Sequence, residues 1–150
     1  MIRKATIKDV EGIIILGEKF YNEAEFHKKG LGLKSDTFGT LVTQLLELPV
    51  ALILVAEKNN KIVGTIGGVI SPWLLDTDQK ILQELWWYVD EEHRGIGHRL
   101  NLKFEREGKK LGANFLLMVT LDSQHENKLI NYYIKMGYEH LEHHFIKKVL

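Results

Sequence analysis

One feature of this 150-residue sequence restricts its fold more than any other: a β-hairpin that leads directly into strand, helix and strand. Val50–Glu57 is rich in leucine and β-branched residues, and Lys61–Ile70 can return as its partner strand. Asn59 and Asn60 between them favour a tight turn, because asparagine tolerates left-handed backbone angles. Lys80–Val89 then continues as a strong strand. A hairpin followed by β-α-β predicts a mixed sheet that helices cover.

The remaining elements fill in this frame. Apolar residues at helical spacing predict four helices, which lie at Asp9–Glu23, from Ser35 to Pro49, at Gly97–Leu111 and at Ser123–Met136. Gly112 and Gly137 follow the last two helices at the position of a C-cap glycine. Outside these helices, the expected elements are strands at Ile2–Ala5 and Phe115–Thr120, a loop at Ser71–Gln79 and a mostly extended segment at Tyr138–Val149. The predicted order is β-α-α-β-β-β-α-β-α-β.

Composition excludes several classes of protein. Apolar residues make up 45% and charged residues 27% of the chain, which is typical of one globular domain. Lys and Arg number 20, as do Asp and Glu, so no global basic surface for nucleic acid is expected. The absence of cysteine excludes a disulfide framework, a thiolate zinc site and a cysteine nucleophile. The most apolar stretch, Pro49–Ala56, is shorter than the roughly 20 residues that span a bilayer. We therefore expect a soluble, cytoplasmic protein without membrane contact.

The segment Tyr88–Leu100 carries the chemistry. A strand ends there, Gly95 and Gly97 follow, and a helix begins. A helix start presents unpaired N–H groups and partial positive charge, and glycine lets a ligand approach the backbone closely. From His93 to Lys110 the sequence has six Lys or Arg and two Glu. Together these features predict an anion site, most naturally for phosphates. A glycine turn before an ordinary solvated helix would leave the same pattern.

Four landmarks resemble the GNAT superfamily of acyl-CoA-dependent N-acyltransferases. Val89–Gly97 is similar to the family's acyl-CoA pyrophosphate loop, but is two residues shorter than the common form. Asn127 and the sequence Tyr-Tyr-Ile-Lys-Met-Gly-Tyr at 132–138 resemble the family's last helix. Ile2–Thr6 and Lys61–Gly64 resemble two of its strand starts. The resemblance implies one N-acetyltransferase domain over residues 1–150 in the α/β (α+β) class. It also implies a mostly antiparallel central sheet with helices on both faces, acetyl-CoA as co-substrate and no metal.

The resemblance also implies which residues bind coenzyme A. Backbone groups of Tyr88 and Val89 would hold the pantetheine arm, and Asn127 would contact the cofactor near it. The pyrophosphate would be bound by the residues at the start of the helix, which are Arg94, Gly95, Ile96, Gly97, His98 and Arg99. If Gly95 and Gly97 match the family's Gly-x-Gly, Glu92 stands where the family usually has Gln or Arg. If Arg94 and Gly95 match the family's Arg-Gly instead, the later glycines of the family's loop are absent.

Two residues are the expected catalytic groups. Tyr133 matches the family tyrosine that protonates the departing thiolate, and a phenol suits a leaving group of similar basicity. The alternative for Tyr133 is an aromatic on the packed face of the helix, although Tyr132 is the better core candidate. Glu84, or a water, would be the base. Glu84 should share a strand face with Trp86 and Tyr88, where burial would raise the pKa of its carboxyl group. A half-exposed strand carboxylate is the alternative for Glu84.

The sequence therefore predicts an N-acetyltransferase that moves an acetyl group from acetyl-CoA to a primary amine. The acceptor would be a small molecule or a peptide, and a homodimer is possible. A catalytically degenerate GNAT-fold module that binds CoA or a protein is the second hypothesis, and nucleic-acid binding along residues 94–110 is a weaker third. A metal site is not expected from the C-terminal histidines, since strand spacing does not bring His140, His143 and His144 to one face.

Overall fold

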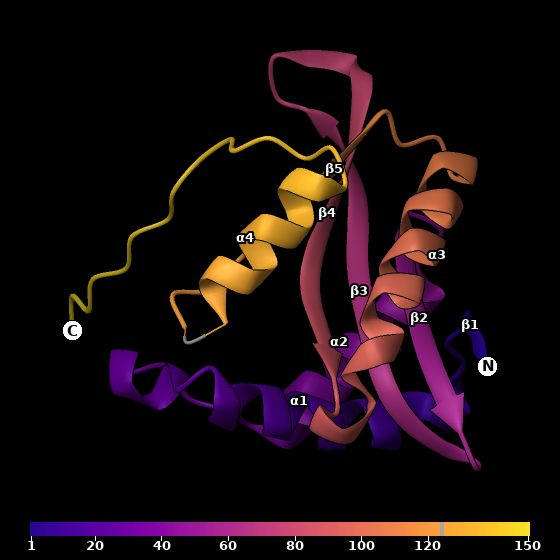
Figure 1. The fold of residues 1–150 in the computed structure, drawn as a ribbon, viewed down its shortest axis with the longest axis vertical. Helices are drawn as coiled ribbons and strands as arrows, with labels where there is room; N and C mark the ends of the chain where they lie inside the picture. Colours follow the sequence, from indigo (N-terminus) through magenta and orange to yellow (C-terminus); the bar gives the residue numbers. More distant parts are fainter. Residues whose placement is uncertain (124) are drawn as a thin grey trace.

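The fold is an open five-stranded sheet (Figure 1). A computed structural model describes residues 1–123 and 125–150. The strands lie in the order β1-β2-β3-β4-β5 and span Ile2–Lys4 (β1), Ala51–Lys58 (β2), Lys61–Trp73 (β3), Asp76–Val89 (β4) and Phe115–Leu117 (β5). Neighbours are antiparallel, except that β4 and β5 are parallel. The expected mixed, mostly antiparallel sheet is confirmed.

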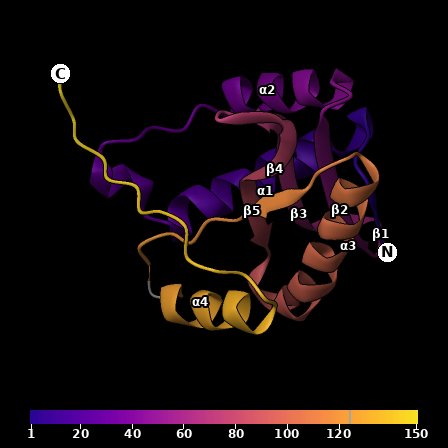
Figure 2. The ribbon, with the colours of Figure 1, turned by 90° about the horizontal axis from the view of Figure 1, so that it is seen from above.

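Helices cover both faces of this sheet, as expected (Figure 2). One face carries α1 (Val10–Glu23) and α2 (Ser35–Glu47), and the other carries α3 (Gly97–Lys110) and α4 (Glu126–Lys135). Three short 3-10 helices connect these elements, at Ile7–Asp9 (η1), Phe26–Lys29 (η2) and Glu91–Ile96 (η3).

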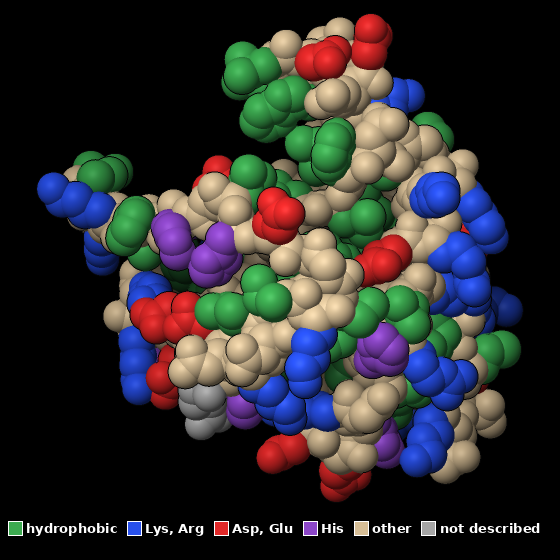
Figure 3. All heavy atoms as spheres, turned by 45° about the horizontal axis from the view of Figure 1, so that its top comes forward, with side chains coloured by type: hydrophobic (Ala, Val, Ile, Leu, Met, Phe, Trp, Pro, Cys, Tyr) green, Lys and Arg blue, Asp and Glu red, His purple; other side chains and the backbone are tan. Residues whose placement is uncertain are grey.

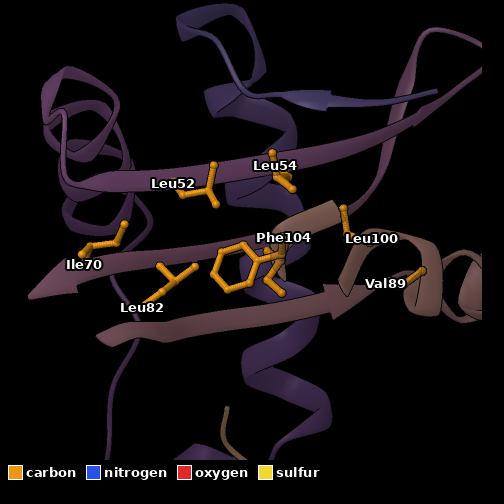
Figure 4. Close-up of a cluster of buried hydrophobic side chains, with 8 residues drawn as sticks. Leu52, Leu54, Ile70, Leu82, Val89, Leu100 and Phe104 are labelled. Atoms are coloured by element: carbon orange, nitrogen blue, oxygen red, sulfur yellow. The ribbon is translucent and has the colours of Figure 1, made fainter. Parts of the chain in front are cut away.

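Each layer has its own apolar core. On the α1/α2 face, Ile13 and Val42 pack with the sheet residues Ile53, Val55 and Trp86. On the α3 face, helix residues pack over the sheet in a cluster of Leu52, Leu54, Ile66, Ile70, Leu82, Val89, Leu100 and Phe104 (Figure 4). Full burial of a side chain of this size contributes about 1.5–3 kcal/mol, so these two clusters hold the layers together.

The turns that the sequence predicts are confirmed. Asn59 and Asn60 have φ angles of 50° and 60°, which suit the tight hairpin between β2 and β3. Gly112 and Gly137 have φ angles of 94° and 87° just after α3 and α4, where only glycine adopts the left-handed conformation without strain.

The predicted loop at Ser71–Gln79 is wrong. β3 continues to Trp73 and β4 begins at Asp76, so the hairpin is a long ribbon with a short turn. Residues 76–80 are exposed and mostly polar; Asp76 pairs with Trp73 and Lys80 with Pro72, and the segment buries no face. They therefore have no apolar alternation by which a sequence could reveal a strand.

The C-terminal part also departs from expectation. β5 ends at Leu117, short of the predicted Thr120, because backbone groups of Val119 bind side chains instead of a neighbouring strand. The predicted helix at 123–136 begins later, at Glu126, and its residue 124 lies outside the described residues. Residues 138–150 follow α4 without pairing in the described sheet, so the expected last strand is not seen.

Gly68 offers a test of this packing. A Cβ atom there would lie 2.5 Å from the carbonyl oxygen of Gln83 and 2.7 Å from the ring of Phe104. Because neither group can move without disturbing the sheet or the core, Gly68→Ala should destabilise the fold by about 1–3 kcal/mol. Urea unfolding measures this as a lower midpoint with an unchanged slope. Gly32→Ala, where no atom lies within 4 Å of the added carbon, is the control and should leave the midpoint unchanged.

Candidate active site

The site begins where β4 and β5 separate. β5 pairs with β4 only from Ile81 to Gln83. Beyond Gln83, no described strand pairs with the outer edge of β4, although its inner edge stays paired with β3 as far as Val89. An open strand edge presents backbone N–H and C=O groups that a ligand can bind.

Glu84 lies at this point of separation. A bulge in the β3–β4 register, with Gly68 opposite Glu84 and Gly67 opposite Trp86, shifts the alternation of β4 by one residue. Glu84 therefore shares its face with Leu82 on the α3 side, whereas Trp86 packs on the α1/α2 side. The expectation that Glu84 shares a face with Trp86 and Tyr88 is wrong, because a single sequence does not reveal a bulge.

The carboxyl group of Glu84 is buried, which excludes the half-exposed alternative. Only 9% of the residue is exposed. The N–H of Val119 donates a hydrogen bond to its Oε2 at 3.0 Å. Burial raises the pKa of Glu84 to about 7, against the opposing effect of the Val119 hydrogen bond. This carboxyl group can accept and release a proton near neutral pH.

Tyr133 approaches the same backbone segment from α4. Its hydroxyl donates to the carbonyl oxygen of Val119 at 3.1 Å, so Glu84 and Tyr133 bind the two backbone groups of one residue. Burial and the nearby Glu84 carboxylate hold the pKa of Tyr133 well above its usual value. Tyr133, and not Tyr132, is the buried member of the pair: Tyr132 is half-buried, and its hydroxyl accepts from Asn101 at 3.1 Å. The prediction that Tyr132 is the better core residue is wrong.

The glycine-containing segment forms the 3-10 helix η3, which runs directly into α3. No side chain caps the start of α3 at Ile96. Gly95 faces open space, with no atom within 4 Å of the place a Cβ would occupy. Gly95 and Ile96 also line a hollow of about 250 Å³. The N–H of Gly97 donates to the carbonyl oxygen of Arg94 in η3, so an anion here would approach the glycine-containing backbone beside the open space and not a free helix start.

A second polar cluster joins α1 to this segment. The guanidinium of Arg94 donates to Glu23 Oε1, and the hydroxyl of Tyr88 donates to Glu23 Oε2 at 3.0 Å. His125 Nε2 lies 3.3 Å from the Glu23 carboxylate and 3.2 Å from Arg94 Nη1. Burial, together with the bond to Glu23, raises the pKa of Tyr88 to about 12. This cluster fixes η3 against α1 and the start of α4.

Comparison with known proteins identifies the family. Residues 18–138 match the Acetyltransferase (GNAT) family. The chain belongs to the GNAT acetyltransferase family. A comparison with curated proteins gives no match.

Solved GNAT structures share the fold at low sequence identity. An aminoglycoside acetyltransferase, HMB0005, from an uncultured soil metagenomic sample superposes with a TM-score of 0.75 and 19% identity over 100% of this chain and 98% of that chain. The ribosomal-protein-alanine N-acetyltransferase of Brucella melitensis biovar Abortus 2308 gives 0.72 and 16%, over 99% of both chains. AAC(6')-Iy in complex with a bisubstrate analog, CoA-S-monomethyl-acetylneamine, gives 0.76 and 14%, over 99% and 96%.

Within this GNAT fold, the four side chains predicted to contact coenzyme A, those of Arg94, His98, Arg99 and Asn127, point in different directions. Arg94 faces Glu23 on α1, and His98 Nδ1 lies 3.1 Å from the hydroxyl of Tyr132 on α4. Arg99 lies on the β1 side of α3, where it lines a hollow of about 330 Å³. Asn127 is exposed in the first turn of α4. The structure therefore brings Glu84 and Tyr133 together but does not gather these four side chains around one point.

Sequence reasoning missed two functional candidates in this GNAT chain. Val119 acts through its backbone, which leaves no signal in the sequence. Glu23 looks like any acidic residue near the end of an amphipathic helix, and only the fold brings it to Arg94 and Tyr88.

Two features are absent from the described residues, 1–123 and 125–150. No helix there has the length and apolar character needed to cross a membrane. In the same residues, no three His, Asp or Glu side chains are grouped so that they could hold a metal ion.

Proposed function

We propose that this GNAT protein transfers an acetyl group from acetyl-CoA to a primary amine by direct attack. The observation that carries the proposal is the pairing of Glu84 and Tyr133 across Val119. It places a buried carboxyl group and a buried phenol on one backbone residue at the open edge of β4. One group is suited to remove a proton and the other to supply one, as aminolysis of a thioester requires.

The proton transfers follow from the two side chains. Glu84, directly or through a water, takes a proton from the substrate ammonium. The free amine attacks the thioester carbonyl, so that a C–N bond forms as the C–S bond breaks. Tyr133 is protonated throughout the neutral range, since its pKa is raised, and it donates its proton to the departing thiolate. The acylated nitrogen gives up its second proton to the Tyr133 phenolate, directly or through a water, and Glu84 releases its proton to solvent. The products are an amide and free CoA.

The donor would lie along the open edge of β4, with its thioester near Glu84. Backbone groups of Tyr88 and Val89 would hold the pantetheine arm. The pyrophosphate would lie against the glycine-containing backbone where η3 meets α3, near Gly95, Ile96 and Gly97. Arg94 would support donor binding indirectly, because its contact with Glu23 fixes η3 in place. The acceptor would be a small-molecule or peptide amine, and the protein is expected to act in the cytoplasm.

Release of free CoA from acetyl-CoA in the presence of a panel of amines tests this function. The panel should include aminoglycosides, polyamines, amino acids and peptides with free N-termini. An amine-dependent release of CoA, with the acetylated amine identified by mass spectrometry, is the expected result. Binding of acetyl-CoA without turnover on any amine would contradict the proposal.

Gly95→Ala tests the donor site separately from the chemistry. The methyl group meets no protein atom, so the unliganded fold should keep its stability. If the pyrophosphate lies against this backbone, the methyl group should raise the Kd for acetyl-CoA about 10-fold, equivalent to about 1.4 kcal/mol. Calorimetric titration measures the Kd. Gly32→Ala is the matched control, and equal affinities in both variants would place the phosphates elsewhere.

A second candidate function is supported by the geometry of η3. The segment is a compact 3-10 helix, and its Arg94 is engaged by Glu23. A GNAT-fold module that binds CoA or a protein partner without turnover is compatible with this arrangement. The amine panel separates the two functions, since a module of this kind releases no CoA.

A further inference from the structure

The outer face of α3 is basic along its whole length. At about 100° per residue, the five Lys and Arg of this helix fall within an arc of about 120°, which they share only with Leu102. These five residues are Arg99, Lys103, Arg106, Lys109 and Lys110. All are exposed except Lys103, which is half-buried. Basic side chains gather along this side of the molecule (Figure 3, right). A chain whose formal net charge is zero thus concentrates positive charge on one helix face.

The two acidic residues of α3 do not neutralise this face. Glu105 is engaged on the flank toward α4, where its Oε1 accepts a hydrogen bond from the hydroxyl of Tyr138 at 2.5 Å. Glu107 lies on the other flank, and its Oε1 is 2.9 Å from Lys110 Nζ and 3.8 Å from Arg106 Nε. One carboxylate is therefore shared between two of the five cations, and the face keeps a net positive charge.

The other three cations of this face are not paired with acids. Among the described residues, neither Arg99 nor Lys109 forms an ion pair. Lys103 Nζ donates to the carbonyl oxygen of Ile2 at 2.7 Å, which orients the ammonium group without cancelling its charge. A hollow of about 330 Å³ opens on this face, lined by Ile2, Arg99, Leu102, Lys103 and Arg106. Three cations around one hollow suit a phosphate group, which arginine binds through two parallel hydrogen bonds.

The spacing of these cations suits a ligand whose charges repeat along a line. Four of them follow one another at intervals of about 4.5 to 6 Å along the helix axis, in a row about 16.5 Å long. They are Arg99, Lys103, Arg106 and Lys110. The face presents one apolar side chain, Leu102, and no aromatic ring on which a base could stack. It therefore has little with which to hold the side chains of a peptide or to read bases, but its cations can follow a phosphate backbone.

We propose that the outer face of α3 binds the phosphate backbone of double-stranded nucleic acid without reading its sequence. The proposal goes beyond the proposed function and does not depend on it, because this binding requires no turnover. The face is also separate from the expected pyrophosphate position. Arg106, Lys109 and Lys110 lie between two and four turns along α3 from Gly97, so these three side chains face away from the donor.

Fluorescence anisotropy with a labelled DNA duplex of about 20 base pairs tests the proposal, since phosphate contacts are the same in any sequence. The wild type should bind this probe in about 50 mM salt with a Kd on the order of 10⁻⁶ M. The logarithm of the association constant should fall with the logarithm of the salt concentration with a slope of about −4.5, as five neutralised phosphates require. No binding in about 50 mM salt, or binding that added salt does not weaken, would overturn the proposal.

A double variant, Arg106→Gln with Lys109→Gln, assigns the binding to this face. Both side chains are exposed, so the melting temperature should not change. The salt slope should weaken to about −2.7, and the Kd in low salt should rise at least about 10-fold. Lys128→Gln with Lys135→Gln is the matched control, since it removes the same charge from exposed positions on α4 and should bind like the wild type. Equal losses in both double variants would show that only the net charge matters and would overturn the assignment to α3.

Two competitors distinguish the duplex from other anions. Acetyl-CoA, in molar excess over the protein, should leave the labelled duplex bound, because the donor lies elsewhere. Polyglutamate should displace the duplex only at a higher concentration of charge than unlabelled duplex does, because its carboxylates do not follow the spacing of a phosphate backbone. Displacement by acetyl-CoA would assign these cations to the donor, and stronger competition by polyglutamate would assign them to an acidic protein. Either result would overturn the proposal, and neither depends on whether the protein acetylates an amine.

Discussion

Glu84→Gln is expected to lower kcat at pH 7 by about 100-fold or more, since general base catalysis contributes about 10²–10⁴-fold. Glutamine keeps an oxygen that accepts the N–H of Val119 but takes up no proton from the amine. In the wild type, kcat/KM should rise with pH up to about 7, as the fraction of ionised Glu84 increases, and then level off. The variant should lose that rise. The measurement is initial rate against pH with the amine that the panel identifies.

The same substitution should stabilise the protein above neutral pH. The pKa of Glu84 is raised from 4.5 to about 7, so the folded protein retains a proton that the unfolded chain releases. This contribution is fully present below pH 4.5 and is lost as the pH rises through about 7. Its size is about 3 kcal/mol, as an upper limit, because the buried amide N–H groups of glutamine require partners of their own. At pH 8 the melting temperature of the variant should therefore rise, by up to roughly 6 to 12 °C.

Glu47→Gln is the matched control, since it removes the same charge at an exposed position on α2. Its rate profile and melting temperature should follow the wild type at every pH. Two results would contradict the role given to Glu84: an unchanged rate profile in Glu84→Gln, or a variant that is less stable than the wild type at pH 8.

The architecture could be predicted from the sequence because its signals are local. Asn59 and Asn60 mark the turn between β2 and β3, and Gly112 and Gly137 mark two helix ends. Alternation and helical spacing then set the type of each element. The family resemblance points to Tyr133, but the sequence does not show that its buried ring lies next to Glu84.

The features that could not be predicted all depend on contacts between distant segments. The bulge opposite Gly67 and Gly68 reverses the face of Glu84, and no residue type marks its position. Arg94 is engaged by Glu23, 71 residues earlier, which charge counting along the sequence does not detect. The end of β5 is set by side chains that bind Val119. In each case the deciding partner is supplied by the fold.

Tyr133→Phe should also lower kcat by about 100-fold or more, because the thiolate then leaves without a proton donor. The ring stays in its buried place, so the Kd for acetyl-CoA should be unchanged. Losing the hydrogen bond to Val119 should reduce stability by only about 1 kcal/mol. Single-turnover rates measure the chemical step free of product release.

Tyr132→Phe, one residue earlier on α4, is the control. It tests whether the loss of rate is specific to the proton donor Tyr133 or follows from removing any tyrosine hydroxyl on this helix. It removes a hydroxyl that contacts Asn101 and His98, away from Val119. Its single-turnover rate should stay within about threefold of the wild type, because the hydroxyl takes no part in the proton transfers. Equal losses in both variants would indicate that α4 had shifted and that Tyr133 has no special role. A loss confined to Tyr133→Phe, with acetyl-CoA affinity retained, is what an acid positioned against the leaving group requires.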